Sequence, residues 1–253
     1  KQFGEIDWFA GYTKMRANDI FELTSAQSES SYARSVRADG ENISAARSNF
    51  MVEHKLITGL DYTTQFFGNN DTRFSLVYVA KSGEPYSVTF DGYDDAFSND
   101  RTDGGYDAAY IPTGVSDPNV VFASSSVANA VMAHVNGTGL AQYKGEIVPR
   151  NAFNSPWIRN LDLRITQDIN LGNDQKVIIY LDITNLLNLI DDEKGIIKEY
   201  SNRSRQIILD EDNPYDSQGR YNIVGVDPDD GLFTQNRYGQ SSYQWNLGFK
   251  YQF

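Results

Sequence analysis

The chain has 253 residues, a formal net charge of −12 and no cysteine. The acidic balance argues against nucleic acid as a partner, because binding phosphates needs a basic surface, and the missing cysteine excludes disulfide bonds and zinc–thiolate sites in this chain. Aromatic residues make up 13% of it, with 16 Tyr and 14 Phe, which is typical of β-sheets that meet an interface between apolar and aqueous surroundings.

The first two candidate strands lie in residues 1–23 and 43–64. Apolar side chains recur at every second position in each, although Phe9 interrupts the polar side of the first and the second is less regular. This alternation predicts strands, because successive side chains of a strand point to opposite faces. The apolar positions are Ile6, Trp8, Ala10, Tyr12, Leu56, Leu60 and Tyr62.

A third candidate strand, 72–90, follows turn-forming residues at 68–71. Its apolar positions keep one phase over the whole length, which predicts a single continuous strand. Those positions are Phe74, Leu76, Tyr78, Ala80, Tyr86, Val88 and Phe90.

Three stretches between candidate strands are polar and rich in Ser, Asn, Asp and Gly. We interpret them as long loops, inside which short apolar segments are candidate extra strands. Structureless loops of this length are unusual in a compact soluble domain, whereas short turns alternating with long loops are typical of outer-membrane β-barrels. The loops are 24–42, 91–157 and 189–242, and the extra strands 196–200, 206–209 and 221–226.

Two further candidate strands, 158–171 and 175–188, flank a short turn. Keeping their apolar residues on one face requires a turn of odd length. A three-residue turn at 172–174 sets Arg164 opposite Asp182 as an ion pair on the polar face. A turn placed one residue later would set a threonine opposite Asp182 instead.

The last candidate strand, 243–253, alternates without interruption, so that one face is apolar and the other carries only polar residues or Gly. A soluble sandwich would bury the apolar face in a core, whereas a barrel would turn it toward lipid. The large size of these side chains favours lipid. The residues that we predict to face lipid are Tyr243, Trp245, Leu247, Phe249, Tyr251 and Phe253.

The six candidate strands predict an all-β fold, a transmembrane antiparallel β-barrel in which all long loops leave one end and both short turns the other. Six strands are too few to close a barrel, for which about eight is the practical minimum, and open sheet edges cannot lie in lipid. We therefore expect that the chain begins inside a longer polypeptide, which supplies the rest of the wall, and that 1–253 is the C-terminal part of one barrel domain.

Four stretches carry a family resemblance: 103–113, rich in Asp and Gly; 150–168, which resembles the entry to a late barrel strand; 181–188, which resembles the outer end of a penultimate strand; and the aromatic terminus ending at Phe253. They are similar to TonB-dependent outer-membrane receptors, particularly the OmpA-related (Oar-type) family. The resemblance covers residues 90–253, whereas 1–90 match only in their alternation.

The resemblance implies a barrel of about 22 strands, of which this chain holds the last six, with a plug domain that lies outside this chain. It implies a receptor or transporter in the cell outer membrane that binds a substrate or moves it across. The implied partners are outer-membrane lipid, the rest of the barrel and plug, the TonB energy-coupling complex and a surface-exposed protein. The alternative function is a secreted or surface β-rich module for adhesion or carbohydrate binding.

Few residues point to chemistry. Calcium binds several hard oxygen ligands on flexible loops, so Asp94, Asp95 and Asp103 are candidate calcium ligands, against the simpler interpretation of an acidic, solvated loop. His54 and His134 are far apart in the sequence, with no Ser or acid placed for a catalytic triad. We therefore predict that the chain is not an enzyme and, calcium aside, binds no cofactor.

Overall fold

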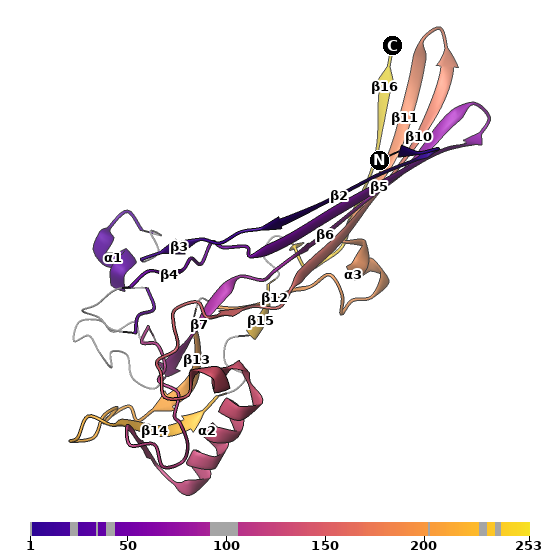
Figure 1. Cartoon of the computed structure of the whole chain (residues 1–253). Coiled ribbons are helices and arrows are strands. Elements are labelled where there is room, and N and C mark those ends of the chain that lie inside the picture. The colour runs from indigo at the N-terminus through magenta and orange to yellow at the C-terminus, as the bar shows by residue number, and fades with distance from the viewer. Residues whose placement is uncertain are drawn as a thin grey trace.

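In the computed structural model of the chain, the described residues are 2–20, 25–33, 35–38, 44–91, 106–201, 203–227, 232–235 and 239–253. Most of them belong to β-strands, and most strand pairs are antiparallel, as the sequence predicts. A long sheet occupies one end of the molecule and a compact body with helix α2 the other (Figure 1). Among the described residues, no helix is both long and apolar enough to cross a membrane.

The long sheet, called the large sheet below, contains the six predicted strands in sequence order, preceded by a two-residue strand. Its order is β1-β2-β5-β6-β10-β11-β16, and all neighbours are antiparallel. The outer strands β1 and β16 pair with no further described strand, so the sheet is open. The strands are β1 (Gln2–Phe3), β2 (Ile6–Lys14), β5 (His54–Phe67), β6 (Asn70–Lys81), β10 (Ile158–Gly172), β11 (Gln175–Thr184) and β16 (Gln244–Gln252).

The two ends of the large sheet differ, as predicted. The short turns β5–β6 and β10–β11 lie at one end, called the hairpin end, where Figure 1 also places both chain termini. The long connections 15–53, 82–157 and 185–243 all leave the other end, called the body end. The antiparallel order of the strands requires this separation, because each connection joins the ends of two adjacent strands.

The predicted register of the β10–β11 hairpin is confirmed, since Arg164 pairs with Asp182 and the flanking apolar residues pair with each other. The turn itself is shorter than predicted. It consists of Asn173 and Asp174, both with positive φ, as hairpin turns of two residues favour. A bulge at Leu171 then restores the predicted register.

The compact body is built from the long connections. Its five-stranded sheet has the order β8-β14-β13-β7-β9, and the pairs β13–β7 and β14–β8 are parallel. Helix α2 packs against β14. The elements are β7 (Pro85–Asp91), β8 (Val120–Phe122), α2 (Ser125–Gly137), the 3-10 helix η1 (Gly139–Tyr143), β9 (Phe153–Asn154), β13 (Arg203–Leu209) and β14 (Tyr221–Val226).

Smaller elements complete the described chain. Strands are present at all three positions where the sequence predicts extra ones, as β12, β13 and β14. Two short strand pairs and two short helices occupy the remaining connections. These are β3 (Asn18–Asp19) with β4 (Ala46–Arg47), β12 (Ile197–Tyr200) with β15 (Leu232–Gln235), α1 (Ser28–Ala33) and α3 (Leu186–Ile190).

Two predictions about the middle of the chain are wrong. The continuous strand over 72–90 breaks at 82–84, so that β6 stays in the large sheet and β7 enters the compact body. Gly83 lies at the break, where a Cβ atom would be 2.4 Å from the carbonyl oxygens of Ser155 and Pro156. The predicted loop 91–157 contains β8, α2, η1 and β9 in its described part, 106–157.

Strand boundaries differ from the prediction as well. Strand β2 ends at Lys14 rather than near residue 23, β5 begins at His54 rather than near residue 43, and β11 ends at Thr184, because α3 starts at Leu186. In each case the difference lies at the body end, where the chain leaves the large sheet for the connections.

The hydrophobic core lies in the compact body. In the described structure, no residue of the buried apolar cluster comes from a strand of the large sheet. The large sheet therefore has apolar side chains but no core in which they are buried. The cluster consists of Tyr86, Val88, Phe90, Ala109, Tyr110, Ile111, Val120, Val131, Met132, Val135, Leu140, Val148, Ile207, Leu209 and Ile223.

Candidate functional site

The strand register joins the apolar side chains of the large sheet into one continuous face. Each row across it takes one residue from each of the six long strands. Polar side chains interrupt this apolar face at several positions, among them Thr58 and Thr64, and Thr72 and Gln167 hydrogen-bond each other on it at 2.5 Å. Two adjacent rows are Ile6, Tyr62, Phe74, Ile165, Leu181, Leu247 and Trp8, Leu60, Leu76, Leu163, Ile183, Trp245.

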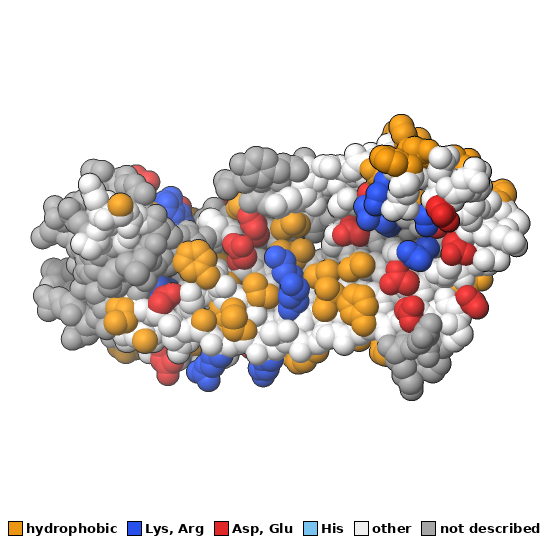
Figure 2. Space-filling model, turned by 90° about the horizontal axis from the view of Figure 1, so that it is seen from above, with side chains coloured by type: hydrophobic (Ala, Val, Ile, Leu, Met, Phe, Trp, Pro, Cys, Tyr) orange, Lys and Arg blue, Asp and Glu red, His pale blue; other side chains and the backbone are white. Residues whose placement is uncertain are grey.

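The apolar face is most exposed on strands β2, β5 and β16, whereas most of its side chains on β6, β10 and β11 are half-buried among their neighbours. Leu247 is 68% exposed and Phe249 76%, and on the far side of the sheet Tyr12 is 63% exposed. Figure 2 shows hydrophobic side chains at the surface along the length of the molecule, with charged side chains between them. A sheet face that joins apolar residues over several strands and leaves many of them exposed is typical of contact with a membrane or another protein.

The residues predicted to face lipid lie in or beside strand β16, at the edge of this face. Four of the six lie in β16 and pair with apolar residues of β11, and the other two flank β16. Each of the six is at least 46% exposed. In chain order they are Tyr243, Trp245, Leu247, Phe249, Tyr251 and Phe253.

The opposite face of the large sheet is mostly polar. Arg164 Nη2 donates to Asp182 Oδ2 at 2.7 Å, and Arg164 Nε donates to the other carboxylate oxygen of Asp182, which confirms the predicted ion pair. The Ser75 hydroxyl donates to the Asp61 carboxylate. The row that contains these residues is Asp7, Asp61, Ser75, Arg164, Asp182 and Asn246.

Two aromatic side chains on the polar face lie over glycines of the neighbouring strand. A Cβ at Gly59 would be 2.1 Å from the ring of Phe9, and a Cβ at Gly248 would be 2.5 Å from the ring of Tyr180. The glycines leave room for the rings to lie flat on the sheet. This packing accounts for Phe9, which interrupts the polar alternation in the sequence.

Aromatic side chains gather at both ends of the apolar face. At the body end, the Tyr12 hydroxyl oxygen is 2.6 Å from His54 Nδ1, and the His54 ring stacks on Trp157 with centroids 6.2 Å apart. At the hairpin end, Tyr251 stacks on Phe253 at 5.8 Å, and exposed Phe66 contacts the edge of Phe74. Between these groups the face carries both aliphatic and aromatic side chains, the latter including Trp8, Tyr62, Phe74 and Trp245.

The predicted calcium ligands Asp94, Asp95 and Asp103 lie outside the described residues. Within the described part of the chain, no group of three or more His, Asp or Glu side chains is placed to hold a metal ion. The two histidines lie in different parts of the molecule. His54 belongs to the apolar face, and His134 in α2 contacts Gln206 of β13, with its Nε2 2.9 Å from the amide oxygen.

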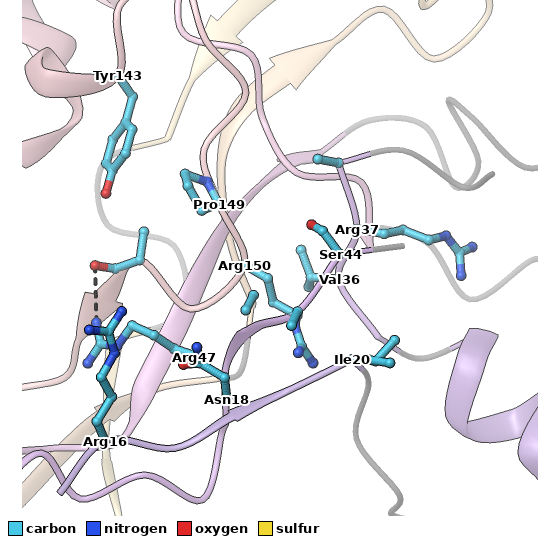
Figure 3. Close-up of a pocket in the computed structure, with 14 residues that line it drawn as sticks. Arg16, Asn18, Ile20, Val36, Arg37, Ser44, Arg47, Tyr143, Pro149 and Arg150 are labelled. Carbon is cyan, nitrogen blue, oxygen red and sulfur yellow. Dashed lines mark hydrogen bonds between the residues drawn. The ribbon is translucent and has the colours of Figure 1, made fainter. Parts of the chain in front are cut away.

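An arginine-lined cavity, which sequence reasoning missed, lies where the compact body meets β3 and β4. Its volume is about 330 Å³, and Arg16, Arg37, Arg47 and Arg150 are among its lining residues. Figure 3 shows Arg150 among the lining residues, while Arg37 extends away from it. These arginines are spread over more than half of the sequence with no regular spacing, so only the fold brings them together.

The geometry thus gives two candidate sites, the apolar face of the large sheet and the arginine-lined cavity. Comparison of the chain with protein-family models, with curated proteins and with solved structures found no match.

Proposed function

We propose that the large sheet is part of the wall of an outer-membrane β-barrel, in a receptor of the TonB-dependent type that binds a substrate or moves it across the membrane. The observation that carries the proposal is an apolar face that runs across six neighbouring strands, is exposed on β2, β5 and β16, and has no buried core packed on it, since the core lies elsewhere. In lipid this face meets hydrocarbon instead of water, and the hydrogen bonds between antiparallel strands satisfy the backbone polar groups.

The separation of the two aromatic groups supports the proposal. Along β5, His54 and Phe66 are twelve residues apart, a span of about 40 Å at roughly 3.3 Å per residue. Barrel strands are tilted by about 40°, which reduces the height of this span to about 30 Å. A bilayer has a hydrocarbon core of about 30 Å, so the aromatic side chains would lie at its two interfaces.

The two faces and two ends then have distinct surroundings. The polar face with Arg164 and Asp182 lines the barrel interior, where water or a plug domain satisfies its charges. The body end with its long connections lies outside the cell and the hairpin end in the periplasm, as in other outer-membrane barrels. The open edges at β1 and β16 pair with the remaining wall of the barrel, because lipid tolerates no unpaired edge.

Site-directed fluorescence tests the proposal. The chain contains no cysteine, so one cysteine can be introduced at a time and labelled with an environment-sensitive fluorophore. In the full-length protein in lipid vesicles, we expect a label at Leu247→Cys to emit as in hydrocarbon, and lipids with a nitroxide on the acyl chain to quench it. The matched control is Asn246→Cys, on the polar face, where the label should report water and escape quenching.

Equal emission and equal quenching at the two positions would refute the lipid-facing assignment. A protein that stays monodisperse without detergent, with both labels in water, would favour the alternative of a surface β-rich adhesion or carbohydrate-binding module.

A further inference from the structure

Arg150 is the most deeply buried arginine of the cavity. Its side chain is 4% exposed and forms an ion pair with Asp19. Nη2 also donates to the Asp19 carbonyl oxygen at 2.7 Å, whereas Nη1 is buried and has no hydrogen-bond partner in the described structure. Buried guanidinium N–H groups nearly always have an acceptor. We therefore infer that a bound molecule supplies the acceptor for Nη1.

Arg47 is held in a fixed orientation beside this site. Its Nη2 donates to Asn154 Oδ1 at 2.6 Å and to Glu53 Oε2 at 3.2 Å. Its Nη1 donates to the Ala152 carbonyl oxygen at 3.3 Å, the bond dashed in Figure 3. These contacts cross from β4 to the compact body and to the start of β5. They keep the guanidinium in place before any ligand arrives, which lowers the entropic cost of binding.

Arg16 adds a positive charge that is not neutralised by the described residues. It is exposed and, within the described ranges, forms no hydrogen bond or ion pair. The described lining of the cavity contains no Asp or Glu, although the whole chain has a net charge of −12. Asp19 and Glu53 neutralise Arg150 and Arg47 from beside the cavity, so Arg16 adds a positive charge beyond these two ion pairs.

The remaining walls favour an organic ligand over a bare ion. Ile20, Val36, Pro149 and several alanines supply apolar surface, and Tyr143 contributes a ring. A volume of about 330 Å³ is at the small end of ligand pockets.

We propose that this cavity binds a small organic anion, whose carboxylate or phosphate is held by arginines of the lining, with Arg150 Nη1 as the donor that has no partner in the described structure. Guanidinium groups suit this task, because their planar N–H donors match the oxygens of both anions. The apolar part of the ligand packs against Ile20 and Val36. The inference does not depend on the membrane proposal, since the cavity lies beyond the body end of the sheet and its occupancy can be measured separately.

Calorimetric titration of the purified full-length protein tests the inference. The probes are benzoate, phenyl phosphate and benzyl alcohol, which share an aromatic ring and carry a carboxylate, a phosphate and a neutral hydroxyl. We expect one or both anions to bind and the alcohol not to bind, with affinity that falls as salt rises. The tighter anion identifies the preferred head group.

Two matched variants locate the site. Arg16→Gln should weaken anion binding by about tenfold or more, since a charged hydrogen bond is lost, and it should fold normally because Arg16 has no described partner. Arg73→Gln removes an exposed arginine of the large sheet and should leave binding unchanged. The inference is overturned if neither anion binds more tightly than benzyl alcohol, or if the two variants weaken binding equally.

Discussion

The substitution Leu247→Arg tests whether the apolar face of the large sheet contacts lipid. Leu247 lies in one row with Leu181 and Ile165, and Ile165 is midway along β10 (Ile158–Gly172), so the row crosses the sheet near mid-height. An arginine at the middle of the bilayer lowers the free energy of unfolding of a barrel by about 2–4 kcal/mol. This corresponds to a folding equilibrium constant that is roughly 30- to 900-fold smaller. On a sheet surrounded by water, the same substitution would change the free energy of unfolding by no more than about 0.5 kcal/mol.

The control places the same charge one residue away. Asn246 pairs with Asp182 on the polar face, so Asn246→Arg adds a cation beside a carboxylate and should cost far less than Leu247→Arg. Urea titration of the full-length protein in lipid vesicles, followed by tryptophan fluorescence, gives both unfolding free energies. Equal stabilities of the two variants, or a Leu247→Arg variant as stable as the unaltered protein, would refute the assignment of this face to lipid.

Three further predictions concern the polar face and the compact body. Arg164→Ala and Asp182→Ala should couple by less than about 1 kcal/mol in a double-mutant cycle, because their side chains are 57% and 24% exposed; a coupling of several kcal/mol would contradict this. Ile207→Ala should lower the free energy of unfolding by about 2–5 kcal/mol, because the side chain is fully buried. Proteases should then cut the compact body first. The same change at partly exposed Ile208 should be tolerated better. Burial, with a smaller contribution from a neighbouring tyrosine, raises the pKa of Tyr86 from 10.0 to about 12. As the pH rises, the Tyr86 hydroxyl loses its proton in the unfolded chain before it does so in the folded one, so the free energy of unfolding should fall between pH 10 and pH 12. A Tyr86→Phe variant whose free energy of unfolding falls as much over this range would contradict the role of Tyr86.

The large sheet was predictable because its signals are local. Alternation identified all six strands, and keeping apolar residues on one face was enough to fix the pairing of Arg164 with Asp182. The turn chemistry of Asn173 and Asp174 was also visible, although the bulge at Leu171 was not. A bulge leaves the apolar phase of both strands intact, so alternation does not reveal whether a turn has two residues or three.

The compact body was missed for two different reasons. Tyr86, Val88 and Phe90 continue the phase of β6, so alternation alone could not show that the chain changes sheets at Gly83. Helix α2 left a signal that we did not use: its buried residues Ala128, Val131, Met132 and Val135 recur at helical spacing. Ser124 caps its first turn by accepting from the Val127 N–H at 3.2 Å.

The arginine-lined cavity left no such signal in the sequence. Arg16 precedes the two-residue strand β3, Arg47 belongs to the two-residue strand β4, and Arg150 comes more than 100 residues after Arg47. Their meeting depends on long-range packing between β3, β4 and the compact body, for which the sequence holds no periodic pattern.

The crowding around Gly83 determines how the compact body can move. Ser155 N donates to the Glu84 carbonyl oxygen at 2.8 Å, Asn154 Nδ2 donates to that of Gly83 at 3.0 Å, and Tyr200 N donates to Ser155 Oγ at 3.0 Å. Three passages of the chain are thus clamped together where not even a methyl group fits. These contacts join the compact body to the chain where β6 ends and just before β10 begins, so we expect a force applied to the body to be shared by both strands.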